Sequence, residues 1–164
     1  MTTIAETEVQ QRLQQAEARC LAQGIRLTTI RKQVLALLLR HEGGVKAYQL
    51  LDEMKAVHEQ STPPTVYRAL DFLQDAGLVH RLDSLNAYVA CHIDQAPHQH
   101  GLLLVCPQCH AVSEIDDPDI CHLLSDRIRL AGYQLQGNCL EIKAMCGECA
   151  RAATPAACCD RHHD

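Results

Sequence analysis

The chain has 164 residues, and its 47% apolar content is enough to build the packed core of one domain or of two small ones. The longest wholly apolar run in the first half, VLALLL at residues 34–39, is far shorter than the roughly 20 residues that span a bilayer, and the start MTTIAETEVQ is too polar for a signal peptide. We therefore expect a cytoplasmic protein with no membrane partner.

The net charge of −5 argues against a nucleic-acid partner, but the charge is unevenly distributed along the chain. Residues 1–92 contain ten Lys/Arg and ten Asp/Glu, whereas residues 93–164 contain five and ten. Between residues 26 and 46 the basic residues outnumber a single acid, Glu42. They are Arg26, Arg31, Lys32, Arg40 and Lys46. This window predicts a local basic surface that could contact phosphates, and the alternative is an ordinary solvated helix face.

The apolar periodicity of the first 60 residues predicts three helices. The first covers residues 6–23 and ends at Gly24, and the second is capped by a threonine at position 28 or 29 and ends at Gly43 and Gly44. The second helix has one apolar face, and the third is expected to bury a stripe at spacings of three and four. These faces consist of Ile30, Val34, Leu37 and Leu38, and of Ala47, Leu50, Leu51, Met54 and Val57.

A fourth helix begins at STPPTVYRAL, where a threonine cap precedes two prolines, and it ends at Gly77. Its core stripe leaves Thr65, Tyr67 and Arg68 on other faces, and a tyrosine beside an arginine near a helix N-terminus suits base edges and phosphates. The stripe is formed by Val66, Ala69, Leu70 and Leu73. The strands LVHRL and AYVAC then flank the turn DSLN, so the first half predicts a winged-helix domain whose fourth helix enters the major groove. The alternative is a helical domain with a hairpin that binds protein.

Residues 92–100, HIDQAPHQH, have no apolar periodicity and form a predicted linker between domains at 1–91 and 101–150. The second domain contains predicted strands at 102–105, 111–115 and 139–145 and a helix at 118–131. The fold class is therefore α+β. Because this small domain buries little alone, we expect it to pair with a second copy, and we expect residues 151–164 to form a flexible tail.

Ten cysteines in a chain without an export signal indicate thiols that bind soft metals rather than disulfides. CPQC contains Cys106 and Cys109, and CGEC contains Cys146 and Cys149. Two Cys-x-x-Cys pairs can complete a tetrahedral thiolate shell at bond lengths of about 2.3 Å, so they predict a structural zinc ion. The competing interpretation, a redox dithiol, needs only one such pair beside a βαβ unit.

A second metal site is predicted from residues on both sides of the linker. If the hairpin and the second domain fold toward each other, His80 and Cys91 can meet a linker histidine, His98 or His100, and Glu114. The result is a mixed sulfur, nitrogen and oxygen tetrahedron that spans the two domains. For any one of these residues a surface histidine or a core cysteine is the simpler interpretation, and the joint arrangement favours the site. With the four-cysteine site it gives at least two Zn²⁺ per chain.

Four segments and the closing CGEC pair resemble the ferric uptake regulator (Fur) family, most closely its zinc-sensing branch. The segments are RLTTIRKQVL, KAYQLLDEM, PPTVYRALDFLQDAGLVHRLDSLNAYVACH and VCPQCHAVSE. The cysteine after the hairpin, Cys91, carries the likeness to the zinc branch, because a thiolate suits Zn²⁺ better than Fe²⁺ or Mn²⁺. The resemblance implies a homodimeric, zinc-dependent repressor of zinc-uptake genes, with one or two dimers on each palindromic operator.

The resemblance also implies roles for individual residues. Tyr48 and Arg68 match base-contacting positions of the zinc branch, Tyr67 and Arg31 match DNA-facing positions of the wider family, and Asp52 and Lys55 match a salt bridge between neighbouring dimers. Neither His98 nor His100 has the family spacing from Cys106, and we prefer His98 as the ligand. Cys121 or His122 together with Cys139 lies near the place of a third family metal site.

Other classes of function are less consistent with the sequence. The His-x-Glu and Pro-Cys-x-x-Cys signature of zinc deaminases is absent, so we expect neither catalysis nor a small-molecule substrate. An iron or peroxide sensor of the same family and a zinc-bound thiol-redox chaperone remain as alternatives. The tail residues Cys158, Cys159, His162 and His163 could chelate zinc loosely.

Overall fold

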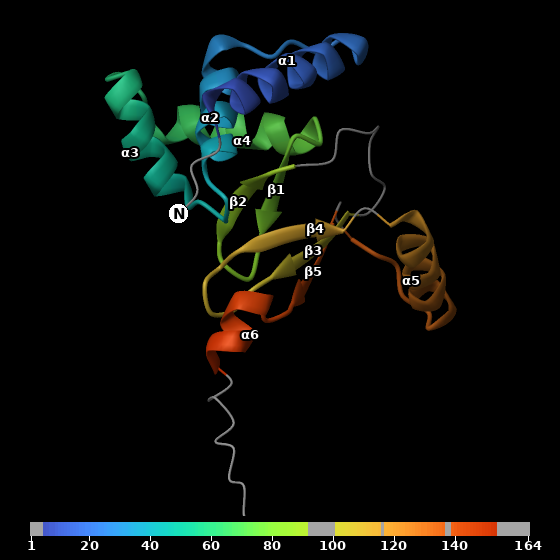
Figure 1. The fold of residues 1–164 in the computed structure, drawn as a ribbon. Coiled ribbons are helices and arrows are strands. Elements are labelled where there is room, and N and C mark those ends of the chain that lie inside the picture. The colour runs from blue at the N-terminus through green and yellow to red at the C-terminus, as the bar shows by residue number, and fades with distance from the viewer. Residues whose placement is uncertain (1–4, 92–100, 116, 137–138, 154–164) are drawn as a thin grey trace, which may run out of the picture.

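The computed structural model describes residues 5–91, 101–115, 117–136 and 139–153. Its N-terminal part, residues 5–91, has four helices and a two-stranded hairpin; its C-terminal part, the described residues of 101–153, has a three-stranded sheet and two helices. The N-terminal elements are α1 (Glu6–Ala22), α2 (Thr29–Arg40), α3 (Ala47–Val57), α4 (Pro63–Asp75), β1 (Val79–Leu82) and β2 (Ala87–Ala90). The C-terminal elements are β3 (Gly101–Val105), β4 (Val112–Ile115), α5 (Pro118–Leu130), β5 (Cys139–Lys143) and α6 (Gly147–Ala153). The mixed α+β class is confirmed, and Figure 1 shows the hairpin lying between the N-terminal helices and the three-stranded sheet.

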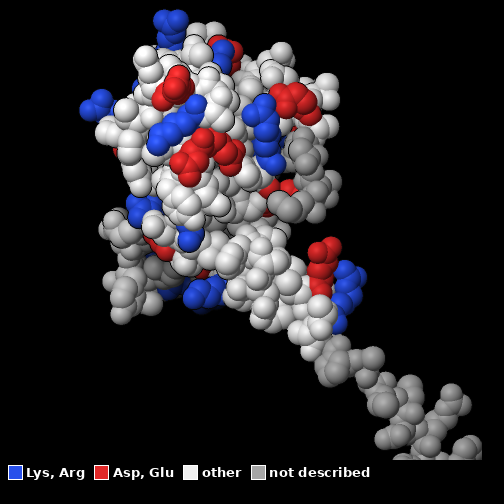
Figure 2. All heavy atoms as spheres, turned by 90° about the vertical axis from the view of Figure 1, so that its left-hand side faces the viewer, with Lys and Arg blue, Asp and Glu red and all other residues white. Residues whose placement is uncertain are grey.

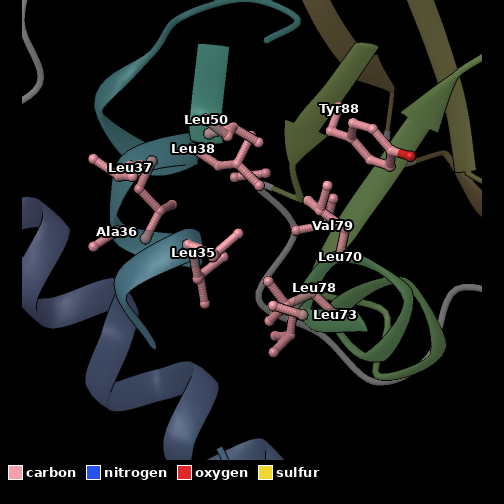
Figure 3. Close-up of a cluster of buried hydrophobic side chains, with 14 of the residues drawn as sticks. Leu35, Ala36, Leu37, Leu38, Leu50, Leu70, Leu73, Leu78, Val79 and Tyr88 are labelled. Carbon is pink, nitrogen blue, oxygen red and sulfur yellow. The ribbon is translucent and has the colours of Figure 1, made fainter. Parts of the chain in front are cut away.

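The N-terminal core is built mainly from α2 and α4 (Figure 3), with contributions from α1, α3 and the hairpin. All six residues 34–39 of α2 are buried, and the predicted α4 stripe is confirmed, with Leu70 and Leu73 fully inside. The α3 stripe was predicted one residue too long, because Val57 is 64% exposed. Val57 is the last residue of α3, where the chain turns toward α4, so no neighbouring element covers it.

The helix ends differ from the predicted caps. Thr28 and Thr62 occupy the N-cap positions of α2 and α4, but neither side chain accepts a backbone hydrogen bond; the Thr62 hydroxyl pairs instead with that of Thr65, at 2.9 Å. Gly24 (φ 71°) and Gly77 (φ 67°) do terminate helices in the left-handed conformation that glycine tolerates. The second helix ends at Arg40, before Gly43 and Gly44.

The predicted basic surface needs correction, because part of its charge is neutralised by α1. Lys32 forms an ion pair with Glu17, and Arg40 pairs with Glu6 at 3.0 Å. Arg31 donates a hydrogen bond to the carbonyl of residue 26, and its guanidinium lies 3.5 Å from the centre of the Phe72 ring. Figure 2, which views the molecule from the α3 side, shows basic and acidic side chains interspersed on that face. The charge count over residues 26–46 did not include these ion pairs, because Glu6 and Glu17 lie on α1.

The C-terminal sheet has the strand order β4-β3-β5, with β3 antiparallel to β4 and parallel to β5. A small apolar cluster of Leu82, Val89, Leu103 and Val105 joins the hairpin to this sheet. The sequence did not predict α6, which extends to Ala153 and so includes three residues assigned to the tail. No helix in the described ranges combines the length and the apolar character needed to cross a membrane.

Candidate metal centres

The two Cys-x-x-Cys pairs meet at one end of the C-terminal sheet. Because β3 and β5 run parallel, the chain leaves both strands at the same edge, and the turn after β3 lies beside the start of α6. The four thiol sulfurs lie within 4.8 Å of one another, and the sulfurs of Cys109 and Cys146 are 3.6 Å apart. A tetrahedral zinc site with bonds of about 2.3 Å has sulfur–sulfur edges of about 3.8 Å. The residues therefore fit a four-thiolate zinc ion. The set is Cys106, Cys109, Cys146 and Cys149.

The electrostatics of this cluster also suit a divalent cation. Hydrogen bonds from the backbone N–H groups of Cys146 and Cys109 lower the pKa of the Cys106 thiol to about 6. The neighbouring sulfurs of Cys146 and Cys109 raise the pKa of Cys149 to about 12. One thiolate thus forms readily, and the nearby sulfurs resist further ionisation. A divalent cation would relieve this repulsion and allow all four thiols to ionise.

A second cluster joins the hairpin to the C-terminal sheet. In the β1–β2 ladder His80 lies opposite Val89, and Cys91 is two residues further along, so both side chains lie on the same hairpin face. Glu114 comes from β4. His80 Nε2 is 2.9 Å from the Glu114 carboxylate, and the Cys91 thiol donates a hydrogen bond of 3.6 Å to the same oxygen. The ligand atoms of all three lie within 4.8 Å of one another, so the residues fit a metal ion bound by nitrogen, sulfur and oxygen.

This second cluster is shielded from solvent. Only 7% of the His80 side chain and 4% of the Glu114 side chain are exposed. Burial opposes protonation of the imidazole, but hydrogen bonds with Cys139, Cys91 and Glu114 outweigh it and raise the pKa of His80 to about 12. A metal ion bound by His80 would replace this proton, so protons and metal compete for the site.

The two clusters do not include every predicted metal ligand that the structure describes. His98 and His100 are outside the described residues. Within the described ranges the only groups of three or more potential ligands are the two above, and Cys121 and His122 belong to neither. Cys139 also stands outside both groups, but its thiol forms a hydrogen bond with His80, a contact that sequence reasoning missed because it depends on the register of β5 against β3.

The residues expected to contact DNA lie on α2, α3 and α4. Tyr48 is 60% exposed and Tyr67 is 50% exposed, although both are large and partly apolar. Arg68 is exposed as well, whereas Thr65 and Arg31 are half-buried. The two residues expected between dimers, Asp52 and Lys55, are both exposed on α3. These positions are accessible to a partner, and their roles stay predictions.

The N-terminal part has a winged-helix arrangement, which is typical of DNA-binding proteins, and the small sheet that follows carries two clusters of potential metal ligands. Comparison with known proteins identifies the family. The model of the "Ferric uptake regulator family" matches residues 22–143. The zinc uptake regulation protein of Escherichia coli (strain K12) is 39% identical over 147 residues, covering 88% of this chain and 84% of that protein. The chain belongs to the ferric uptake regulator family.

Two solved structures share the whole arrangement. One is a zinc uptake regulator complexed with zinc and DNA, which has a TM-score of 0.79 at 36% identity and covers 88% of this chain and 96% of that chain. The other is holo XcZur, with a TM-score of 0.75 at 41% identity, covering 90% of this chain and 99% of that chain. At these identities and TM-scores the likeness shows the fold over most of the chain.

Proposed function

We propose that this chain is a zinc-responsive, DNA-binding transcription regulator that represses zinc-uptake genes as a zinc-loaded homodimer on a palindromic operator. The observation that carries the proposal is the largely buried cluster of His80, Cys91 and Glu114, which draws potential ligands from the hairpin and from the C-terminal sheet. The similarity to a zinc uptake regulator bound to zinc and DNA supports it. The role is regulatory rather than catalytic, and a regulator of genes acts in the cytoplasm, where a bacterial chromosome lies.

The two clusters have different tasks in this proposal. The four cysteines hold a structural zinc ion with a closed thiolate shell. His80, Cys91 and Glu114, completed by His98 or His100 from the linker 92–100, form the regulatory site. A metal ion bound there supplies a cross-link between the hairpin and β4. The Cys91 thiolate favours zinc over the harder iron and manganese ions, which prefer oxygen and nitrogen ligands.

The C-terminal part has an apolar surface that suits a second copy of the chain. Ile120, Leu123 and Leu130 of α5 are 44%, 58% and 78% exposed, and no residue of α5 is buried. Side chains of this size prefer to be covered, and a symmetric dimer can cover them. In a dimer the two α4 helices must lie about 34 Å apart to enter successive major grooves, so the angle between the N- and C-terminal parts decides whether the dimer fits DNA.

DNA contacts in this proposal come from α4 and its neighbours. Tyr48 on α3 and Arg68 on α4 contact bases, while Tyr67, Arg31 and Thr65 face the DNA. The exposure of both tyrosines supports this assignment. Asp52 and Lys55 link neighbouring dimers where an operator binds two. The domains of this proposal are residues 1–91 and 101–150, connected by the linker.

The experiment is a zinc titration of operator binding with the Cys91→Ser variant. The DNA is a palindromic duplex selected from a random library by the zinc-loaded protein. Allosteric couplings are usually about 1–3 kcal/mol, so zinc should strengthen wild-type binding by about 5- to 150-fold. Cys91→Ser should abolish this gain and hold one zinc ion fewer per chain, because a serine hydroxyl is a poor zinc ligand.

The matched control is Cys121→Ser, which removes a thiol that belongs to neither metal cluster. It should retain the full zinc response. A Cys91→Ser protein with unchanged zinc dependence would refute the regulatory role of this cluster. If iron or manganese strengthened operator binding and zinc did not, the chain would instead be an iron or peroxide sensor of the same family.

A further inference from the structure

A carboxylate of the C-terminal sheet forms hydrogen bonds with the turn of the hairpin. Glu141 lies in β5, in register with Leu103 of β3. Its two carboxylate oxygens accept hydrogen bonds from two successive backbone N–H groups of the turn between β1 and β2. The Asp83 N–H bonds one oxygen, and the Ser84 N–H bonds the other at 3.2 Å. Glu141 and its partners are more than fifty residues apart in the chain, so this contact depends entirely on how the two parts of the molecule meet.

The contact is well suited to fixing a turn in place. Hydrogen bonds to an ionised carboxylate are about twice as strong as those between neutral groups. Since the two oxygens bond adjacent N–H groups, the turn is held in orientation as well as position. The Glu141 contact and the cluster of His80, Cys91 and Glu114 lie toward opposite ends of the hairpin. The turn that Glu141 contacts joins β1 to β2, and Cys91 follows the far end of β2.

Other contacts confine the same turn but do not set its angle. Leu85 packs against the apolar cluster of Leu82, Val89, Leu103 and Val105. Gly44 passes so close beneath the hairpin that an added Cβ would lie 2.9 Å from a Leu82 methyl group. Apolar packing is non-directional, so these contacts favour proximity of the hairpin and the sheet. Among the contacts found in the described residues, the paired hydrogen bonds of Glu141 are the ones that give the turn a defined direction.

We propose that Glu141 is a positioning residue that latches the hairpin turn to the C-terminal sheet and thereby sets the orientation in which the N-terminal part meets DNA. The inference rests on the proposed DNA-binding function and adds a second anchor to it. The regulatory cluster ties one end of the hairpin to β4, and Glu141 ties the other end to β5. An isolated β-bridge between Gly43 and Ala111 also joins the two parts, and the Glu141 contact adds the link at the turn that completes the set. The structure is similar over 88% of the chain to a zinc uptake regulator complexed with zinc and DNA, which supports the assignment of the latched arrangement to the DNA-binding state.

The test compares Glu141→Ala and Glu141→Gln with wild-type protein. In the first measurement, amide hydrogen exchange at Asp83 and Ser84 is followed by NMR on the zinc-loaded full chain. Exchange should be faster in Glu141→Ala, because both N–H groups lose their acceptor. The exchange rates in Glu141→Gln should lie between those of Glu141→Ala and wild-type protein, since the amide oxygen of glutamine can accept one bond while its NH₂ group faces the other donor. Exchange in the β3–β5 ladder should not change, because that ladder uses backbone groups only.

In the second measurement, zinc is titrated against operator binding for the same variants. The zinc concentration at half-maximal operator binding should rise on the order of tenfold in Glu141→Ala, and less in Glu141→Gln, with one tenfold step equal to about 1.4 kcal/mol. The control is Asp126→Asn, which removes one negative charge from a pair with Arg129 inside α5. It should match wild-type protein in both measurements.

Each result decides a separate point. Unchanged exchange at Asp83 and Ser84 in Glu141→Ala, in protein that retains its four-cysteine zinc ion, would overturn the latch. Faster exchange with an unchanged zinc midpoint would also overturn the proposal, since the contact would then be local and without effect on orientation. If wild-type protein bound DNA without any zinc dependence, the proposed function would fail, and the exchange measurement would still decide whether Glu141 holds the turn.

Discussion

The N-terminal and C-terminal parts of this chain are stabilised in different ways. The N-terminal part has a continuous apolar core, in which side chains from four helices and the hairpin exclude water from one another. In the C-terminal part α5 and α6 contain no buried residue, and the apolar cluster of the sheet is shared with the hairpin. The first part can therefore fold through the hydrophobic effect, whereas in the proposed function the second depends on cross-links: a metal ion, the hairpin and a second copy of the chain.

This difference explains where a metal ion can act as a signal. A cross-link that a small domain needs for folding is always occupied, so it cannot report a concentration. The His80, Cys91 and Glu114 cluster lies between two parts that each have another source of stability. In the proposed function, binding there changes orientation rather than folding. The two clusters are thus suited to opposite tasks because of what surrounds them.

The largest expected effect is the loss of the four-cysteine site. Cys106→Ser should unfold the C-terminal part and leave the N-terminal part folded, because structural zinc contributes about 10–16 kcal/mol to the folding of small domains. Residue-resolved NMR should show the C-terminal amide signals collapsing toward random-coil shifts while those of α2 and α4 persist. Cys20→Ser, which alters a buried thiol of the N-terminal core, is the contrasting variant and should retain a folded C-terminal part. Simultaneous loss of both parts in Cys106→Ser would show that the N-terminal core is not self-sufficient.

The second prediction concerns the N-terminal core itself. Leu70 is fully buried between α4 and α2, so Leu70→Ala should lower the free energy of unfolding of the N-terminal part by about 2–5 kcal/mol. Zinc content should not change, because no ligand contacts the cavity. Chemical denaturation followed by NMR of N-terminal residues measures the first quantity, and metal analysis measures the second.

The control for this core variant is Leu21→Ala, which shortens a side chain that is 76% exposed and should change stability by less than about 0.5 kcal/mol. Equal destabilisation by the two variants would mean that burial of Leu70 does not contribute to the free energy of unfolding of the N-terminal part. Loss of zinc from Leu70→Ala would mean that the two parts do not fold separately.

The sequence was sufficient to predict features that depend on local spacing. The core stripe of α4 follows from apolar residues three and four apart, and the four-cysteine site follows from two Cys-x-x-Cys pairs. The group of His80, Cys91 and Glu114 was also predicted, although its linker histidine lies outside the described residues. The α4 stripe and the grouping of the four cysteines were predictable because their periodicity and spacing are local, whereas the second group also required the assumption that the hairpin and the second domain fold toward each other. That both groups bind metal stays a prediction.

Features that depend on how distant elements meet were not predictable. The ion pair between Arg40 and Glu6 neutralises charge that a local window counts as free. The contacts of Glu141 with the hairpin turn and of Cys139 with His80 both depend on the register of β5 against β3. An acidic or thiol side chain in a strand gives no sequence signal of such a partner. The caps failed for a related reason, since a threonine at an N-cap position has the right chemistry but not necessarily the right rotamer.

The smallest expected effects compare one cap from each part of the molecule. Asp117 accepts hydrogen bonds from the N–H groups of residues 119 and 120 at 3.0 and 3.1 Å, at the start of α5. The Thr62 side chain, at the start of α4, accepts no such bond, and its hydroxyl pairs with that of Thr65. Asp117→Ala should therefore cost about 1 kcal/mol, and Thr62→Ala about 0.5 kcal/mol or less. Unfolding midpoints of the two parts, followed separately by NMR, measure both.

The cap of α5 should matter more than the cap of α4 because the two parts of the molecule are stabilised in different ways. The helix α4 buries an apolar stripe in the N-terminal core, so tertiary packing holds it without a cap. The helix α5 has no buried residue within the chain, so local interactions at its ends carry more of its stability. A larger loss from Thr62→Ala than from Asp117→Ala would contradict the contrast between a part stabilised by its core and a part stabilised by specific polar contacts and cross-links. Adding a second copy of the chain sharpens the test: if α5 packs against its partner, raising the protein concentration should reduce the effect of Asp117→Ala and leave that of Thr62→Ala unchanged.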